Sequence, residues 1–142
     1  MSHVTYWIAP LALSCCLALP AQAELYVVMG VSSKPVQLNL QNIKNIFLGR
    51  INTLPGGARA IPIDQHDGNP LREEFYVKVT NLSAAQAKAH WARLYFTGRG
   101  TPPVEARNSQ DIKLQLNQIP NTLSYLEKAA LDSTVRIIQT IP

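Results

Sequence analysis

The chain has 142 residues, with 13 Lys+Arg against 9 Asp+Glu and a formal net charge of +4. This length allows one domain with a removable leader and argues against two full domains. Hydrophobic residues make up 46% and charged residues 15%, which excludes a disordered chain. No three basic residues are consecutive, so a nucleic-acid interface is not indicated, whereas a small anion or an acidic partner remains compatible with the mild positive charge.

Residues 1–23 have the pattern of a signal peptide. An apolar run from Tyr6 to Leu19 is followed by Ala21-Gln22-Ala23, a typical cleavage site. We therefore predict cleavage after Ala23 and export to a bacterial periplasm, although the segment before the apolar run lacks Lys and Arg. An uncleaved anchor is the alternative, but the run is shorter than the roughly 20 residues that span a bilayer, so no stable membrane span is expected after cleavage.

Cleavage removes both cysteines of the chain, Cys15 and Cys16. A lipid attached to either is a weaker alternative, because no leucine stands three residues before Cys15. The remaining domain, residues 24–142, then has no cysteine with which to form a disulfide, a thiolate nucleophile or a cysteine metal site.

The pattern of residues 24–142 predicts strands alternating with helices. Apolar runs predict strands at 25–29, 60–63, 122–126 and 135–138, with a short turn at 127–131 between the last two. Pro62 places the second strand near a sheet edge or a bulge. Capping residues and apolar spacing predict helices at 40–48, from Pro70 to about Val79, at 84–95 and at 109–118. This order is typical of an α/β domain with a mixed sheet flanked by helices.

Sequence motifs of enzymes and cofactor sites are missing. The sequence contains no H-E-x-x-H, G-x-S-x-G, P-loop or Rossmann glycine pattern, so neither an enzyme nor a cofactor is expected. The run from Asp64 to Asp67 offers possible metal ligands, but turn formation explains it without a metal. Glu73 and Glu74 are adjacent on a helix and do not face each other, so they are interpreted as helix-dipole partners. His90 is interpreted as a surface or packing residue.

The segment Asp67–Arg72 has the character of a ligand-binding site. A glycine turn at Gly68 leads into a helix whose first backbone N–H groups point outward, a common arrangement for binding anions. Arg72 would add a charged, two-pronged donor. The alternative is an ordinary helix with Asn69 as its N-cap, in which Glu73 and Glu74 already balance the positive charge of the helix dipole at its N-terminus.

Several motifs together resemble the phosphate ABC-transporter substrate-binding proteins, in particular their small, signal-bearing, phosphate-binding-like members. The resemblance extends over nearly all of residues 27–138 and rests on the order and spacing of six segments: Ile46-Phe47-Leu48-Gly49-Arg50, Pro55-Gly56-Gly57, Ile61-Pro62-Ile63, Asp67-Gly68-x-x-x-Arg72-x-x-Phe75, Trp91-x-x-x-Tyr95-Phe96-Thr97-Gly98-Arg99-Gly100-x-Pro102-Pro103 and Leu123-Ser124-Tyr125-Leu126.

The resemblance implies one lobe of a type 2 periplasmic-binding protein, with ligand-binding residues at Asp67, Gly68, Asn69, Leu71 and Arg72. The family's loop typically reads Asp-Gly-Ser-Gly-Thr, and here Asn69-Pro70-Leu71 takes the last three places. Two hydroxyls and one N–H donor are thereby lost, so phosphate binding through this loop is expected to be weak. Full-length members close two lobes on the ligand, whereas this chain has room for one.

Two hypotheses about function remain. The first is a periplasmic solute-binding-like protein that holds phosphate or another oxyanion weakly, or as a homodimer that restores a two-sided cleft. The second is a non-transport envelope protein that uses one lobe as an interaction scaffold for another envelope protein. The segment 97–103, which contains Arg99, is interpreted as an exposed structural loop.

Overall fold

A computed structural model describes residues 23–142 of the chain, and the predicted signal peptide up to Gln22 lies outside the described residues. Within the described part, no helix is both long enough and apolar enough to cross a membrane.

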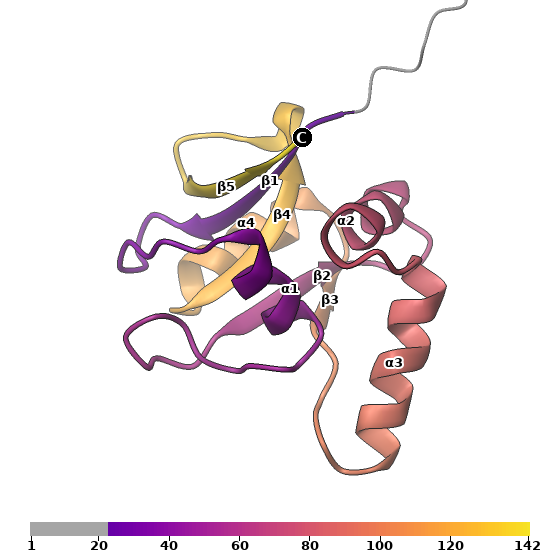
Figure 1. Cartoon of the computed structure of the whole chain (residues 1–142). Coiled ribbons are helices and arrows are strands. Elements are labelled where there is room, and N and C mark those ends of the chain that lie inside the picture. The colour runs from indigo at the N-terminus through magenta and orange to yellow at the C-terminus, as the bar shows by residue number, and fades with distance from the viewer. Residues whose placement is uncertain (1–22) are drawn as a thin grey trace, which may run out of the picture.

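A five-stranded mixed sheet forms the centre of the molecule, in the order β3-β2-β4-β1-β5 (Figure 1). β2 runs parallel to its neighbours β3 and β4, and β1 runs antiparallel to β4 and β5. The predicted mixed α/β architecture is therefore confirmed. The strands span Leu25–Gly30 (β1), Ile61–Gln65 (β2), Val104–Ala106 (β3), Thr122–Glu127 (β4) and Val135–Ile141 (β5).

The four helices begin and end close to the predicted residues because their caps are encoded locally. Asn39 and Ser83 form capping boxes, and Asn69 caps the helix that begins with Pro70. Gly49 follows the first helix with φ +69°, as a C′ glycine requires. The helices span Leu40–Phe47 (α1), Pro70–Thr80 (α2), Ala84–Phe96 (α3) and Ser109–Gln118 (α4).

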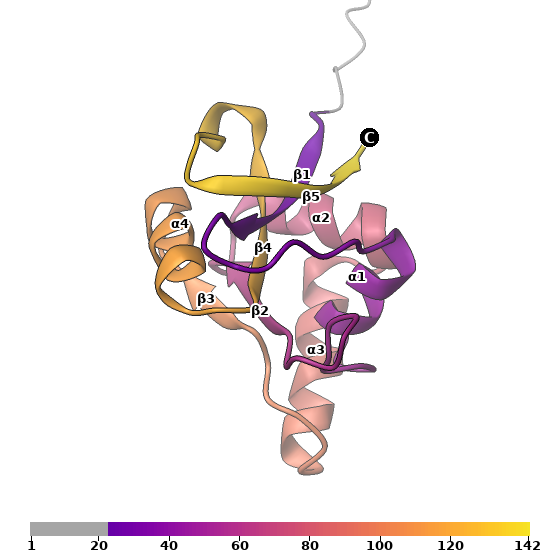
Figure 2. The ribbon, with the colours of Figure 1, turned by 90° about the vertical axis from the view of Figure 1, so that its left-hand side faces the viewer.

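Both faces of the sheet are buried. Leu25, Val27 and Met29 of β1 pack into the larger cluster with α1 and α2, while Tyr26 and Val28 pack with α4 on the opposite face. The turned view shows α4 on one side of the strands and α1 and α2 on the other (Figure 2). Burial on both faces explains why the sequence of β1 is a continuous apolar run and does not alternate between apolar and polar residues.

Two details differ from the sequence expectation. The short edge strand β3 was not predicted, since it consists of three residues whose pairing partner, β2, lies far back in the chain. The position of β2 is more specific than predicted: it lies near the edge of the sheet, next to the edge strand β3, and Pro62 pairs only with β4, because pairing with β3 begins at Ile63. Proline is therefore accommodated where one side of the strand has no neighbour.

Helix α3 and the connection 97–103 extend beyond the sheet (Figures 1 and 2). Trp91 attaches this projection to the rest of the molecule, since its Nε1 donates to the carbonyl oxygen of Phe47 at 3.0 Å. His90 contacts the carbonyl oxygen of Leu48 at 2.7 Å, in agreement with a packing role.

Candidate functional site

The turn between β2 and α2 is the predicted anion-binding loop. Gly68 has φ +85° with open space where a side chain would stand, so glycine is required by the backbone alone. The Asn69 side chain accepts a hydrogen bond from the Leu71 N–H at 2.9 Å. The Leu71 side chain packs against the core instead of facing solvent. The Asn69 side chain, the Leu71 N–H and the Leu71 side chain therefore all have partners within the protein.

Asp67 lies at the outer end of this turn and forms an ion pair with Lys88 of α3, with 2.5 Å between Oδ2 and Nζ. The hydrogen bond from Lys88 holds the pKa of Asp67 below its usual value. An anion approaching the turn therefore meets a carboxylate that stays charged.

Arg72 is 6% exposed and lies beneath the same turn. Its Nη1 donates to Glu105 Oε1 at 2.7 Å and to the carbonyl oxygen of Gln65 at 3.3 Å. Its Nε lies 3.5 Å from Asp64 Oδ2 and has no hydrogen-bond partner among the described residues. Burial lowers the pKa of Arg72, but the charges of Asp64 and Glu105 outweigh this and leave the pKa above its usual value.

Asp64 is the buried counter-charge of this arrangement, with 1% of its surface exposed. Its carboxylate accepts hydrogen bonds from the hydroxyl of Tyr76 at 2.7 Å, the hydroxyl of Tyr125 and the N–H of Gln65 at 2.9 Å. Burial raises the pKa of Asp64, and the two tyrosine hydroxyls and Arg72 oppose part of that rise. Burial and the nearby carboxylate raise the pKa of both tyrosines, which therefore remain hydrogen-bond donors.

A cavity of about 280 Å³ lies beside Arg72, between α3 and the strands β2 and β3. Arg72, Asp64, Glu105 and Lys88 form its polar side, and the apolar side consists of Trp91, Ala92, Tyr95, Phe96, Pro102 and Pro103. The structure thus brings one predicted site residue, Arg72, to the wall of a cavity. Asp67 does not line the cavity but forms an ion pair with Lys88, which does. Gly68, Asn69 and Leu71 do not line it either.

Sequence reasoning did not assign four residues to this arrangement: Asp64, Tyr76, Glu105 and Tyr125. Asp64 was considered only as a possible metal ligand, and Tyr125 only as part of a motif of the family resemblance. Tyr76 stands four residues after Arg72 and so shares its helix face, which was a usable signal. Asp64 and Tyr125 lie in strands whose apolar patterns gave no indication of a shared site. Glu105 belongs to the unpredicted strand β3.

The other polar groups considered in the sequence have separate partners. Glu73 accepts a hydrogen bond from the N–H of Ala84 at 2.8 Å, and Glu74 pairs with Lys78 at 2.7 Å. The two glutamates therefore do not act as a pair. Across residues 23–142, no group of three or more His, Cys, Asp or Glu side chains is arranged to hold a metal ion.

The architecture matches solved substrate-binding proteins of phosphate transport. An ABC-type phosphate transport receptor from Vibrio cholerae superposes with a TM-score of 0.64 at 13% identity, over 82% of this chain and 46% of the receptor. The chain has the fold of one periplasmic-binding-protein lobe. This confirms the fold implied by the sequence resemblance.

Two further structures show the same relation. A putative phosphate ABC transporter substrate-binding protein from Clostridium perfringens, solved with bound phosphate, gives a TM-score of 0.63 at 21% identity, over 82% of this chain and 45% of that protein. PstS from Borrelia burgdorferi gives 0.53 at 11% identity, over 82% and 47% respectively. No protein-family model and no curated protein matches the sequence.

The chain therefore spans less than half the length of the transport proteins that it matches. These neighbours are transport substrate-binding proteins and not enzymes. At such low sequence identity the likeness concerns the fold, and any ligand of this chain has to be argued from its own residues.

Proposed function

We propose that the protein is exported to the periplasm, is cleaved after Ala23, and binds phosphate or another small oxyanion weakly without catalysing a reaction. Arg72 carries this proposal. It is a buried guanidinium in the first turn of α2, on the wall of a cavity, and its Nε lies 3.5 Å from Asp64 Oδ2 without making a hydrogen bond to the described residues. A charged donor in this position is suited to a small anion.

The same contacts explain why binding is weak. Glu105 already occupies Nη1 of Arg72, and the Asn69 side chain already occupies the Leu71 N–H. The carboxylates of Asp64 and Glu105 also line the cavity and repel an incoming anion. A phosphate that binds Nη1 has to displace the Glu105 carboxylate, so its binding energy is reduced by the loss of that ion pair. A second copy of the chain facing the cavity would bury the anion further, and this is our proposal for any homodimer.

Glu105→Gln provides a test that leaves Arg72 in place. This substitution removes the competing negative charge and leaves Arg72 with a weaker, neutral acceptor, so phosphate affinity should rise about fivefold, equivalent to roughly 1 kcal/mol. Isothermal titration of phosphate into the exported protein, purified free of phosphate, measures the change. Sedimentation with and without phosphate shows whether binding depends on a dimer.

Glu74→Gln is the matched control, because it removes the same charge from α2 where Glu74 pairs with Lys78. Its phosphate affinity should equal that of the wild type. Equal affinities in the Glu105 and Glu74 variants, or no heat with the Glu105 variant at tens of millimolar phosphate, would refute oxyanion binding at Arg72.

A second candidate function is an envelope interaction protein that uses the lobe as a scaffold. One observation favours it: Tyr95 and Phe96 at the end of α3 are 60% and 85% exposed, next to Pro102 and Pro103. Exposed neighbouring aromatic side chains are typical of protein interfaces. The exposed Arg99 nearby favours a partner with an acidic surface.

Photo-crosslinking in cells tests this second function. A photoreactive phenylalanine analogue at position 96 should give one discrete adduct that is lost when Arg99→Glu reverses the local charge. Val77 on α2, also an exposed apolar residue, is the control position. The same adducts from both positions, or an adduct that persists with Arg99→Glu, would contradict a specific acidic partner.

A further inference from the structure

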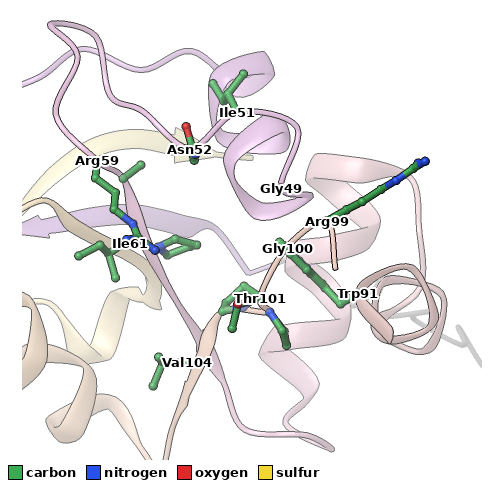
Figure 3. A pocket seen from close by; sticks show the side chains of 14 residues that line it. Gly49, Ile51, Asn52, Arg59, Ile61, Trp91, Arg99, Gly100, Thr101 and Val104 are labelled. Atoms are coloured by element: carbon green, nitrogen blue, oxygen red, sulfur yellow. The ribbon is translucent and has the colours of Figure 1, made fainter. Parts of the chain in front are cut away.

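A second cavity, of about 350 Å³, lies on the other side of the Pro102-Pro103 segment, toward the beginning of β2 (Figure 3). Trp91 and the two prolines line both cavities, so they separate one from the other. The residues of the predicted anion-binding loop, 67–72, do not contribute to this second cavity.

The net charges around the two cavities differ, because two cations and two carboxylates line the first cavity and only cations are the charged residues of the second. Arg59 and Arg99 are the charged residues of the second cavity, and no Asp or Glu is among its lining residues. Neither arginine takes part in an ion pair among residues 23–142. Arg72, by contrast, has two carboxylates beside it. The second cavity therefore offers an anion a cation that no internal carboxylate neutralises.

A hairpin holds Arg59 in place. The N–H of Ala60 donates to the carbonyl oxygen of Asn52 at 2.9 Å, and Thr53 and Arg59 form an antiparallel bridge. The N–H of Leu54 donates to the carbonyl oxygen of Ala58 at 2.7 Å, next to the tip of the hairpin. These contacts fix the backbone from which the exposed Arg59 side chain extends, so little backbone entropy is lost on binding.

The close view shows how the side chains face the cavity (Figure 3). Arg59 lies with Ile61 on the β2 side, and Trp91, Gly100 and Thr101 lie opposite. The side chain of Arg99 extends away from the other labelled residues. Arg59 is therefore the residue that meets an anion inside the cavity.

The indole of Trp91 forms a rigid apolar wall. A Cβ at Gly49 would lie 2.5 Å from Cη2 of the indole, and one at Gly100 would lie 3.3 Å from Cζ3. The glycines thus let the backbone approach the ring closely from two segments, while Nε1 is bound to the carbonyl oxygen of Phe47. Ile51, Ile61 and Val104 add aliphatic surface to the same cavity.

We propose that this cavity binds a small organic anion, with an apolar body against Trp91 and a carboxylate or phosphate monoester group on Arg59. Asn52 and Thr101 line the cavity as further hydrogen-bonding groups for that head group. Inorganic phosphate fills only the polar end and leaves the apolar wall uncovered. This site uses residues other than those of the proposed oxyanion site at Arg72, and it does not depend on that site.

The test uses phenyl phosphate, inorganic phosphate and phenol as probes. Trp91 is the sole tryptophan after position 23. Mass spectrometry of the intact exported protein first establishes that the signal peptide has been cleaved, and the tryptophan fluorescence then reports on Trp91 alone. Phenyl phosphate should change the emission saturably, with an affinity about tenfold or more above that of either inorganic phosphate or phenol. An affinity for phenyl phosphate no higher than that for inorganic phosphate would overturn the proposal.

Two substitutions of exposed arginines locate the binding. Arg59→Gln should weaken phenyl phosphate binding about tenfold or more, and Arg59→Lys should retain part of the affinity, because the charge remains but the planar fork is lost. Arg93→Gln removes the same charge from α3 outside the cavity and should leave the affinity unchanged. Equal losses in the Arg59→Gln and Arg93→Gln proteins would refute binding at Arg59.

Glu105→Gln separates this proposal from the oxyanion proposal. It should strengthen the binding of inorganic phosphate at Arg72 and leave phenyl phosphate binding unchanged, since Glu105 lines only the first cavity. Tighter binding of phenyl phosphate in that variant would place the ligand at Arg72 and overturn the assignment to the second cavity.

Discussion

Removing the hydroxyl of Tyr125 should expose the energetic cost of the buried carboxylate at Asp64. Tyr125→Phe deletes one donor to Asp64, while Tyr76 and the Gln65 N–H remain. The ring stacking on Phe75, with centroids 3.8 Å apart, needs no hydroxyl and should persist. A hydrogen bond to a charged group contributes about 1.5–3 kcal/mol, and Asp64 is only 1% exposed. We expect a loss of about 2–3 kcal/mol in the free energy of unfolding at neutral pH.

The loss should depend on pH, because burial raises the pKa of Asp64 in the folded protein. Between the usual aspartate pKa of about 3.9 and the raised value, the folded state binds more protons than the unfolded state, so stability falls as pH rises. Removing a donor raises that pKa further and widens this range. The destabilisation by Tyr125→Phe should therefore be larger at pH 7 than at pH 4.

Urea unfolding followed by far-ultraviolet circular dichroism at both pH values measures the effect. Tyr26→Phe is the matched control, because the Tyr26 hydroxyl donates to the exposed Glu24 and the change should have little effect. If Tyr125→Phe is no more destabilising than Tyr26→Phe, or equally destabilising at both pH values, the account of Asp64 as a buried charge dependent on its donors is wrong.

Two further predictions concern a glycine and a surface aspartate. Gly49→Ala should lower the melting temperature much more than Gly56→Ala: both positions have positive φ, but only at Gly49 would the new Cβ stand 2.5 Å from the Trp91 ring. Equal shifts in thermal melts would contradict that contact. Hydrogen bonds, chiefly from Lys113, lower the pKa of Asp132 to about 2, so its contribution to stability is present above the usual aspartate pKa and is lost as pH falls toward 2. Asp132→Asn should make stability less dependent on pH over that acidic range, and an unchanged pH profile in urea unfolding would contradict this.

Much of the fold could be predicted because its signals are local. The caps at Asn39, Asn69 and Ser83 each act within three residues, and the apolar run of β1 reflects burial on both faces of the sheet. Strand β3 could not be predicted in this way, since three residues after a proline pair have no periodicity and depend on pairing with β2.

The candidate site was less predictable because its contacts are distant in sequence. Arg72 was identified from the start of α2, and it does line a cavity. Its partner Glu105 is 33 residues away, and the Tyr125 hydroxyl reaches Asp64 across 61 residues. A sequence pattern could not show that Arg72 already has carboxylate partners, and this long-range pairing decides how strongly the site can bind an anion.

An amide-resolved NMR titration of the exported protein with inorganic phosphate tests the central claim most directly. Phosphate at Arg72 has to disturb the turn above it and the cap of α2, so we predict saturable shifts concentrated at the amides of Gly68, Asn69, Leu71 and Arg72. Shifts confined to the hairpin around Asn52 and Arg59, or no shifts at tens of millimolar phosphate, would contradict oxyanion binding at the start of α2.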